Sequence, residues 1–262
     1  MSEIAGKKPV EKITNAAQQA AKQETTAPPV REYRTLAFQV ALFAAIAAFG
    51  VLTFMVKTTP LLTLDIQIEQ AIQSINSPIF AAFMNSISWP GFSPQSFILS
   101  VLIVLLFYVL GLRWESISVL VAAVVTPLAN TLVKIVIRRP RPTIDLVHVL
   151  RILNSYSFPS GHVMFYVGFF GFLWFLVFTL LKRSLRRTLL LILIGIFIAF
   201  VGVSRIYLGQ HWPSDVLGAY LLGGLTLLGI IQFYRWGKKR FFVRQPVAPP
   251  SPTEVKKANP AK

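Results

Sequence analysis

The sequence contains no cysteine and few acidic residues. The absence of cysteine excludes disulfide bonds, thiol catalysis and thiolate metal sites, and it leaves the redox compartment undetermined. Ten Asp and Glu residues and three His residues are spread over 262 positions, and no acidic cluster resembles a magnesium or two-metal site. The sequence therefore favours a chemistry that uses no metal and no other cofactor.

Basic and apolar residues dominate instead. The net charge is +16, and 54% of the residues are hydrophobic, which is too apolar for an ordinary soluble domain and indicates a polytopic membrane protein. The basic residues form short clusters between long apolar runs, a pattern typical of topology signals and lipid headgroup contacts. We therefore expect membrane lipids as partners, no nucleic acid and no obligate protein partner.

Six apolar runs approach the ~20 residues that an α-helix needs to cross the hydrocarbon core. They are Leu36 to Val56, Pro94 to Leu112, Ile117 to Ile137, Val163 to Leu181, Thr188 to Val203 and Val216 to Phe233. The fold class expected is all-α, a polytopic membrane bundle of six helices. Residues 1–35 and the basic, Pro-rich residues 235–262 are expected to be disordered tails on either side of a membrane domain at 36–234. Because a long polar tail precedes it, the first run lacks the form of a cleavable signal peptide.

The Lys and Arg residues predict the orientation of these helices. With the N-terminus inside, 19 of the 26 Lys and Arg residues fall on the inner side. The positive-inside rule then places both termini in the cytoplasm. The connections between the third and fourth runs and between the fifth and sixth runs both face outward.

The segment between the first two runs, residues 65–88, has a helical pattern of its own. Its apolar positions are Ile68, Ile72, Ile75, Ile79, Phe83 and Ile87. Polar residues such as Glu69, Gln73 and Asn76 lie opposite them. This predicts an amphipathic helix in the outer interface, interrupted at Pro78, with Trp89 and Phe92 at headgroup level. Whether this helix gates lateral entry of a lipid or only caps the bundle stays open.

Three polar motifs lie in the middle of the chain. They read KX6RP from Lys134 through Arg141 and Pro142, PSGH from Pro159 to His162, and SRX5HX3D from Ser204 through Arg205 and His211 to Asp215. Each is weak alone, but together they specify eleven positions in a fixed order, which makes a chance match negligible. The set resembles the type 2 phosphatidic acid phosphatase (PAP2) superfamily of membrane lipid phosphatases. The resemblance implies a PAP2/haloperoxidase-like helical core and a catalytic domain at 36–234.

The residue types in these motifs suit phosphoryl transfer, which needs positive charge over the phosphate oxygens and a nucleophile in line with the leaving group. Arg141 and Arg205 offer planar forks for phosphate, and Lys134 adds a compact charge. Ser160 is placed to cap a helix whose first N–H groups, at Gly161 and His162, would form an anion site.

The third motif places His211 four residues before Asp215. Asp215 can accept the Nδ1 proton of His211, which leaves Nε2 free to attack phosphorus. The resemblance implies the same roles: His211 as the nucleophile that forms a phosphohistidine, Asp215 as its orienter, and His162 as the acid. It also implies a set of phosphate-binding residues, namely Lys134, Arg141, Ser160, Gly161 and Arg205.

Three further residues near the motifs lie outside the signature. Arg138 and Arg139 are interpreted as headgroup contacts, and His148 as a loop residue.

The resemblance thus implies an integral membrane phosphatase of the inner or plasma membrane. Its active site would be extracytoplasmic and its substrate a lipid phosphate or pyrophosphate, such as undecaprenyl pyrophosphate, phosphatidylglycerophosphate or phosphatidate. The alternatives are a lipid phosphotransferase and a non-catalytic lipid-binding or transport relative, the second of which His162, His211 and Asp215 argue against. Related vanadium haloperoxidases are soluble, unlike this chain.

Overall fold

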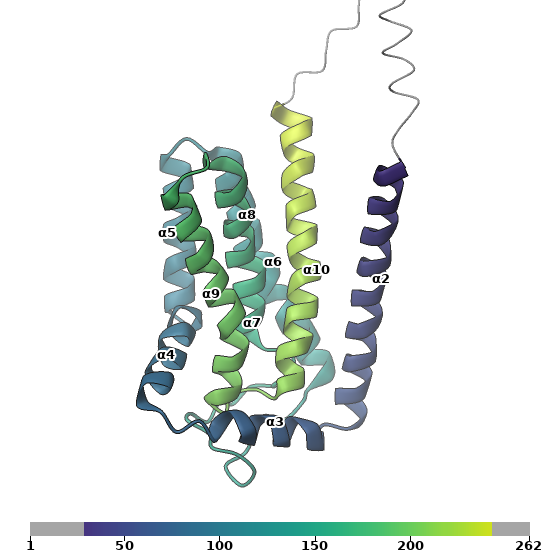
Figure 1. The fold of residues 1–262 in the computed structure, drawn as a ribbon, viewed down its shortest axis with the longest axis vertical. Helices are drawn as coiled ribbons and strands as arrows, with labels where there is room; N and C mark the ends of the chain where they lie inside the picture. The colour runs from purple at the N-terminus through teal and green to yellow at the C-terminus, as the bar shows by residue number, and fades with distance from the viewer. Residues whose placement is uncertain (1–28, 243–262) are drawn as a thin grey trace, which may run out of the picture. The chain divides into compact units, whose positions relative to one another are not determined.

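A computed structural model describes residues 29–242, which are helical and contain no strand. The helices are α2 (Pro29–Thr58), α3 (Thr63–Gln73), α4 (Pro78–Ser88), α5 (Gln95–Val109), α6 (Arg113–Ile137), α7 (Gly161–Phe165), α8 (Gly171–Leu180), α9 (Leu185–Tyr207) and α10 (Pro213–Gly237) (Figure 1). A π-helical turn joins α7 to α8, and another extends α10 to Phe242. Of the predicted tails, residues 1–28 and 243–262 lie outside the described residues, and the remainder belongs to α2 and α10.

Within residues 29–242, five helices are long and apolar enough to cross a membrane: Thr35–Thr58, Arg113–Ile137, Gly161–Leu180, Leu185–Tyr207 and Pro213–Phe242. A sixth span exists only if Pro78–Gly91 and Gln95–Val109, which meet at an angle of 58°, are counted as one. With 15 residues, α5 is about 22 Å long, less than a hydrocarbon core of ~30 Å. The predicted second span therefore needs α4 to complete it.

The predicted amphipathic segment forms two helices, α3 and α4, and the break before Pro78 agrees with the predicted interruption. α4 starts where expected, because Ser77 accepts a hydrogen bond from the Phe80 N–H and Pro78 occupies the first turn. In α3 the polar side faces the protein: Asp65 and Glu69 are buried, whereas Leu64 is 65% exposed. α3 crosses the ends of α9 and α10 (Figure 1). Its Asp65 accepts a hydrogen bond from the Ser214 N–H at the start of α10, and its Gln73 donates to the Tyr207 carbonyl oxygen at the end of α9.

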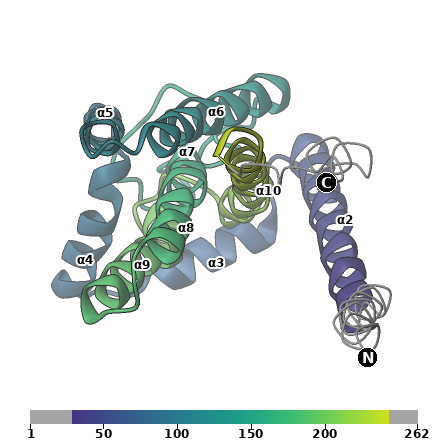
Figure 2. The same ribbon diagram turned by 90° about the horizontal axis from the view of Figure 1, so that it is seen from above.

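α10 packs closely against its neighbours because small residues line its contacts. A Cβ added to Gly223 would lie 2.9 Å from Cβ of Val167, so glycine is required at this crossing. Figure 2 shows α10 beside α6 and α7 when the helices are seen from above. The first turn of α10 is thereby held next to the start of α7.

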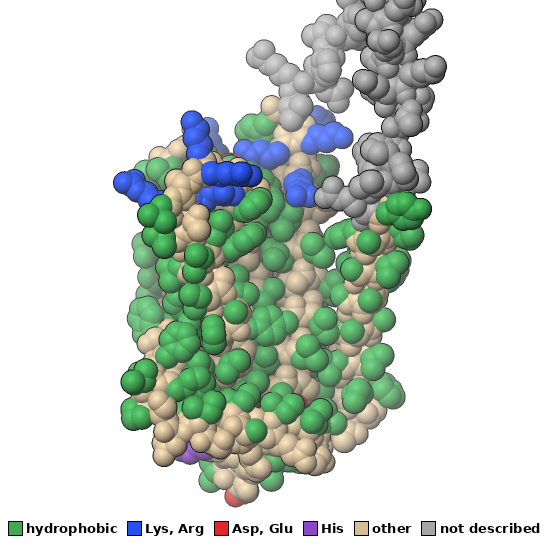
Figure 3. All heavy atoms as spheres, in the orientation of Figure 1, with side chains coloured by type: hydrophobic (Ala, Val, Ile, Leu, Met, Phe, Trp, Pro, Cys, Tyr) green, Lys and Arg blue, Asp and Glu red, His purple; other side chains and the backbone are tan. Residues whose placement is uncertain are grey.

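On the face shown in Figure 3, a group of Lys and Arg side chains lies at the end of the helices where α8 joins α9 and where α10 ends. The opposite end carries α3 and the connection between α6 and α7 (Figure 1). The three motifs lie at that opposite end, since Lys134 ends α6, Gly161 begins α7, Arg205 ends α9 and Asp215 begins α10.

Candidate active site

The first motif lies where α6 ends. Arg138 adopts the left-handed conformation, with φ of 56°, and Pro140 and Pro142 follow, so the helix cannot continue. Lys134, in the last turn, donates to the carbonyl oxygens of Tyr156 at 2.5 Å and Ser157 at 3.2 Å. Its ammonium is thus tied to the loop that leads into the second motif.

Arg141 joins the same loop to the third motif. Its Nε donates to the Ser155 carbonyl oxygen at 2.8 Å, and its Nη1 donates to the Gln210 carbonyl oxygen at 2.5 Å. Nη1 also lies 3.2 Å from Nε2 of His211. Because a guanidinium only donates, Nε2 of His211 acts as the acceptor and the ring proton belongs on Nδ1.

His211 is 2% exposed. Burial, followed by the charges of Arg141, Lys134 and Arg205, holds the pKa of its imidazole well below the usual value. The ring is therefore neutral at physiological pH, the form that a nucleophilic histidine needs.

The expected hydrogen bond from His211 to Asp215 is replaced by a longer contact. Nδ1 lies 3.6 Å from Oδ2 of Asp215, and the Ser157 hydroxyl lies 3.4 Å from Nδ1 while it donates a short hydrogen bond to the same Oδ2. Ser157 thus connects the histidine to the carboxylate, and it belongs to no predicted motif.

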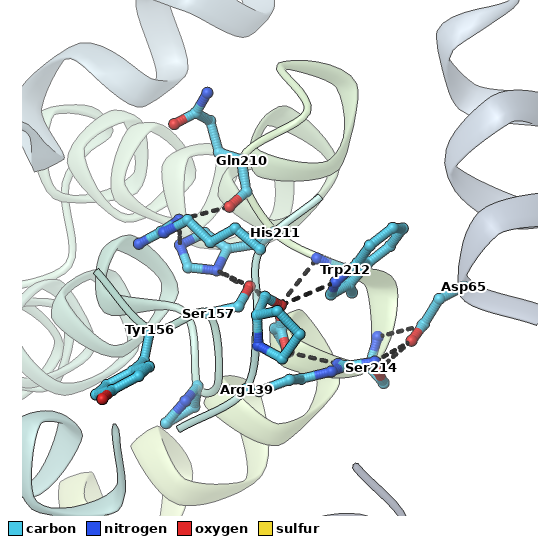
Figure 4. A network of polar contacts seen from close by, with 12 residues as sticks. Asp65, Arg139, Tyr156, Ser157, Gln210, His211, Trp212 and Ser214 are labelled. Atoms are coloured by element: carbon cyan, nitrogen blue, oxygen red, sulfur yellow. Dashed lines mark hydrogen bonds and ion pairs between the residues drawn. The ribbon is translucent and has the colours of Figure 1, made fainter. Parts of the chain in front are cut away.

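Arg139 is the main correction to the sequence analysis. Its side chain is fully buried, so it is not a headgroup contact, and it forms ion pairs with Asp215 at 2.6 Å and Asp65 at 2.7 Å (Figure 4). Arg138 is exposed, and its Nε donates to the Ile135 carbonyl oxygen. An arginine next to the signature thus belongs to the site and is shielded from lipid.

The second motif begins α7, as predicted. Ser160 is buried at the N-cap, but its Oγ makes no capping hydrogen bond. Its backbone N–H donates to the Asp215 carbonyl oxygen at 3.2 Å, which joins the second motif to the third.

The last residue of α4, Ser88, and the 3-10 turn Trp89–Gly91 with Phe92 after it form another wall of the site. The ring of Phe92, predicted at headgroup level, packs edge-on against His162, with 4.8 Å between centroids. Arg205 donates from Nη1 to the Ser88 hydroxyl at 3.0 Å. A Cβ on Gly91 would lie 2.5 Å from Cδ2 of His162. Sequence reasoning missed these three α4 neighbours because none belongs to a recognisable motif.

Three buried polar atoms from the motifs have no hydrogen-bond partner within residues 29–242: Ser160 Oγ, His162 Nε2 and Arg205 Nε. A buried unpaired polar group costs roughly 1–3 kcal/mol, so three at motif positions suggest a ligand that would satisfy them. Two can donate to an anion, and the third can hold a proton. A phosphate group suits this set.

Two cavities adjoin the motif residues. One of about 380 Å³ reaches Gly161 and is lined mainly by apolar residues of α5 and α6, among them Phe97, Val101 and Val124. The other, of about 400 Å³, is lined by Arg141, Gln210 and the 142–153 loop.

Comparisons with known proteins agree with this geometry. The PAP2 superfamily matches residues 115–239. Phosphatidylglycerophosphatase B of Bacillus subtilis (strain 168) is 32% identical over 199 residues, which cover 74% of this chain and 94% of that protein. The chain belongs to the PAP2 superfamily. It is therefore an integral membrane protein and a metal-independent lipid phosphate phosphatase, as the three motifs predicted.

Two further comparisons support the assignment. The crystal structure of a transmembrane PAP2-type phosphatidylglycerolphosphate phosphatase from Bacillus subtilis has a TM-score of 0.66 and 29% identity, and the match covers 76% of this chain and 98% of that chain. Phosphatidylglycerophosphatase B of Haemophilus influenzae is 37% identical over 103 residues, which are 37% of this chain and 40% of that protein. The all-α membrane fold predicted from the sequence is confirmed.

Proposed function

We propose that the chain hydrolyses the terminal phosphate of phosphatidylglycerophosphate through a phosphohistidine at His211. The observation behind the proposed phosphate site is the set of three buried atoms without a hydrogen-bond partner among the described residues, on Ser160, His162 and Arg205. The names of the relatives from Bacillus subtilis and Haemophilus influenzae support the choice of substrate over undecaprenyl pyrophosphate and phosphatidate.

In the first step Nε2 of His211 forms a bond to phosphorus while the bond from phosphorus to the leaving oxygen breaks. His162 donates a proton to that oxygen, which leaves as the lipid alcohol. Lys134, Arg141 and Arg205 neutralise the charge on the phosphoryl oxygens, a role suited to their positions around His211. In the second step water attacks phosphorus, His162 takes its proton, and His211 is released with phosphate.

Substrate binding must release Nε2 of His211 from Arg141. The two nitrogens lie 3.2 Å apart, and a phosphate dianion is a stronger acceptor for a guanidinium than a neutral imidazole. Arg141 would thus turn to the phosphate and expose the nucleophile only when a substrate is present.

The surroundings of the site suit a lipid. The apolar cavity at Gly161 can take the start of an acyl chain on the side of His162, where the leaving group must depart. The Lys and Arg clusters at the opposite end support an extracytoplasmic site with both termini in the cytoplasm (Figure 3).

Phosphate release from phosphatidylglycerophosphate, undecaprenyl pyrophosphate and phosphatidate tests the proposal with purified protein in detergent. We expect the highest kcat/KM for phosphatidylglycerophosphate and no release by His211→Ala with any of the three. A preference for another lipid would overturn the substrate assignment alone. Turnover by His211→Ala would overturn the phosphohistidine mechanism.

A further inference from the structure

Arg139 makes contacts with every nitrogen of its guanidinium group. Nε donates to the Pro60 carbonyl oxygen at 2.9 Å, and Nη2 donates to Oδ2 of Asp65 at 2.7 Å. Nη1 donates to Oδ1 of Asp215 at 2.6 Å and to the Ser214 hydroxyl at 2.7 Å. A single buried cation therefore bridges two carboxylates, one from α3 and one from the candidate catalytic pair (Figure 4).

Asp65 is fastened to the start of α10 independently of this bridge. Its Oδ1 accepts from the Ser214 N–H at 2.8 Å, and its Oδ2 accepts from the Ser214 hydroxyl at 2.6 Å. A carboxylate at a helix N-terminus is also favoured by the helix dipole. Asp65 thus holds Arg139 and the first turn of α10 in one arrangement, next to Asp215.

Stability alone is a weak reason for such a network. Replacing buried ion pairs with apolar residues of similar volume is often neutral or stabilising, so a fold need not bury three charges to attach a short helix. The arrangement does control the candidate catalytic carboxylate. Arg139 holds Oδ1 of Asp215, whereas Oδ2 accepts from the Trp212 N–H at 3.0 Å and from the Ser157 hydroxyl and faces His211.

We infer that Asp65 and Arg139 are positioning residues for the nucleophile. Arg139 fixes the plane of the Asp215 carboxylate, and Asp65 holds Arg139 and balances its charge. The inference rests on the proposed roles of His211 and Asp215. It makes α3 part of the catalytic assembly and gives its buried polar face a function.

The two residues carry opposite charges, so their removal should shift the titration of His211 in opposite directions. Besides Asp215, the charged and titratable groups around this site are Lys134, His162, Arg205 and Arg141, with Glu69 on α3. None of these residues is replaced in the variants. Burial raises the pKa of Glu69 to about 9, so its titration does not fall on the acid limb of the activity profile. The acid limb of kcat/KM reports protonation of His211 in the free enzyme.

The test compares Asp65→Asn, Arg139→Met and the double variant in the hydrolysis of phosphatidylglycerophosphate by the full chain. Losing a group that orients a catalytic histidine costs ~10⁴-fold in kcat, and outer partners of such groups cost about 10–100-fold, so we expect the smaller range for each single variant. The acid limb should move to lower pH in Asp65→Asn and to higher pH in Arg139→Met.

The double variant gives the sharpest result. Arg139→Met leaves the Asp65 and Asp215 carboxylates facing each other without a cation, and adding Asp65→Asn removes that repulsion. Asp65→Asn should therefore lower kcat in the wild-type chain and raise it in the Arg139→Met chain. Two residues that served only stability, without acting on one another, would give losses that multiply.

Gln73→Ala is the matched control. Gln73 anchors α3 through hydrogen bonds with the backbone N–H and carbonyl oxygen of His148 and touches neither ion pair. It should leave kcat and the acid limb unchanged. An equal loss in Gln73→Ala, multiplying losses in the double variant, or an unshifted acid limb in both single variants would overturn the inference. If Arg139→Met does not fold, the acid limbs of Asp65→Asn and Arg139→Lys test the inference instead. The acid limb should be shifted to lower pH in Asp65→Asn and should stay near that of the wild type in Arg139→Lys. Activity in His211→Ala would contradict the proposed function itself.

Discussion

At the scale of single residues, the two histidines of the site are expected to serve different bonds. In the proposed mechanism His211 forms the bond to phosphorus and His162 protonates the leaving oxygen, an assistance worth roughly 10²–10⁴-fold. A nitrophenolate leaves readily without a proton, but a lipid alcohol does not. His162→Ala should therefore nearly abolish lipid phosphate hydrolysis and keep the nitrophenol burst from p-nitrophenyl phosphate, while His211→Ala loses both.

Rapid mixing measures the burst, and acid-labile phosphate on the protein measures the intermediate. Because His162 also activates water in the second step of the proposed mechanism, His162→Ala should release the intermediate more slowly and keep the burst. Equal loss of the burst in the two variants would show that this division of roles is wrong.

Glu69 predicts a pH-dependent stability. Both carboxylate oxygens are buried without a hydrogen-bond partner within residues 29–242, and burial, then Asp215 and Asp65, raises its pKa from 4.5 to about 9. The favourable contribution of its neutral form is complete below pH 4.5 and is lost as pH rises toward 9, because the unfolded chain then releases a proton that the folded chain keeps. Glu69→Gln should remove this loss.

Thermal unfolding in detergent between pH 5 and pH 9 measures the effect. The amount by which the Tm of Glu69→Gln exceeds that of the wild type should grow with pH and be greater than about 2 °C at pH 8. The conversion is that a change of 1 kcal/mol in the free energy of unfolding shifts Tm by ~2–4 °C. Glu115→Gln is the control, since Glu115 is ion-paired with Lys238 at 2.6 Å and its replacement should lower Tm. A constant Tm difference across the pH range would contradict the assignment of a neutral Glu69.

At the scale of helices, the apolar runs predicted the spans well and their ends less well. The third run ends at Ile137 both in the prediction from the sequence and in the structure, because Arg138 and the prolines after it stop α6. The fifth run was predicted from Thr188 to Val203, but α9 extends from Leu185 to Tyr207. The apolar run did not include the first and last turns of α9 because these turns carry charged residues. Such residues are compatible with a membrane helix, since long basic side chains can extend to the interface or enter a polar site.

The contacts of α3 and α4 with the site could not be predicted in the same way. The motif residues were recognisable from their spacing and order. The pairing of Asp65 with Arg139, 74 positions apart, leaves no periodic signal in the sequence. The amphipathic pattern of residues 65–88 gave the helices and their break at Pro78, yet it could not tell whether the polar face meets water or protein. Only the tertiary arrangement shows that Glu69 is inside.

The close approach of α4 to His162 gives a prediction for the helix end. In Gly91→Ala the new Cβ would meet Cδ2 of His162 at 2.5 Å and Cε2 of Tyr166 at 2.8 Å, and Tyr166 is held by its hydrogen bond to the Ile87 carbonyl oxygen. The histidine ring must therefore move. Lipid hydrolysis should fall at least about 10-fold with the nitrophenyl phosphate burst retained, as for loss of general acid catalysis.

Gly229→Ala provides the control, because a Cβ on Gly229 meets nothing within 4 Å. Its lipid turnover should equal that of the wild type. If Gly91→Ala retained full lipid turnover, the site would tolerate a displaced His162, and the role of α4 as a wall of the site would be wrong.

At the scale of the whole molecule, the basic clusters outside the motifs and the candidate site lie at opposite ends of the helices. The basic clusters surround the connection between α8 and α9 and the end of α10, and the motifs lie where α6, α7, α9 and α10 meet at the other end (Figure 3). We expect a site at one end of the spans to draw its substrate from one leaflet. The side on which phosphate is released thus follows from the orientation of the chain.

Reporter fusions test that orientation. Fusions after Arg113, after Arg183 and at the C-terminus should report the cytoplasm, because these positions lie among the basic clusters. Fusions near Asp145 and Gln210, in the connections that carry the motifs, should report the extracytoplasmic side. All positions reporting the reverse would place the reaction in the cytoplasmic leaflet and leave the site intact. Asp145 and Gln210 on different sides would contradict the site itself, since Arg141 donates to the Gln210 carbonyl oxygen at 2.5 Å and both connections must lie on one side for that contact to form.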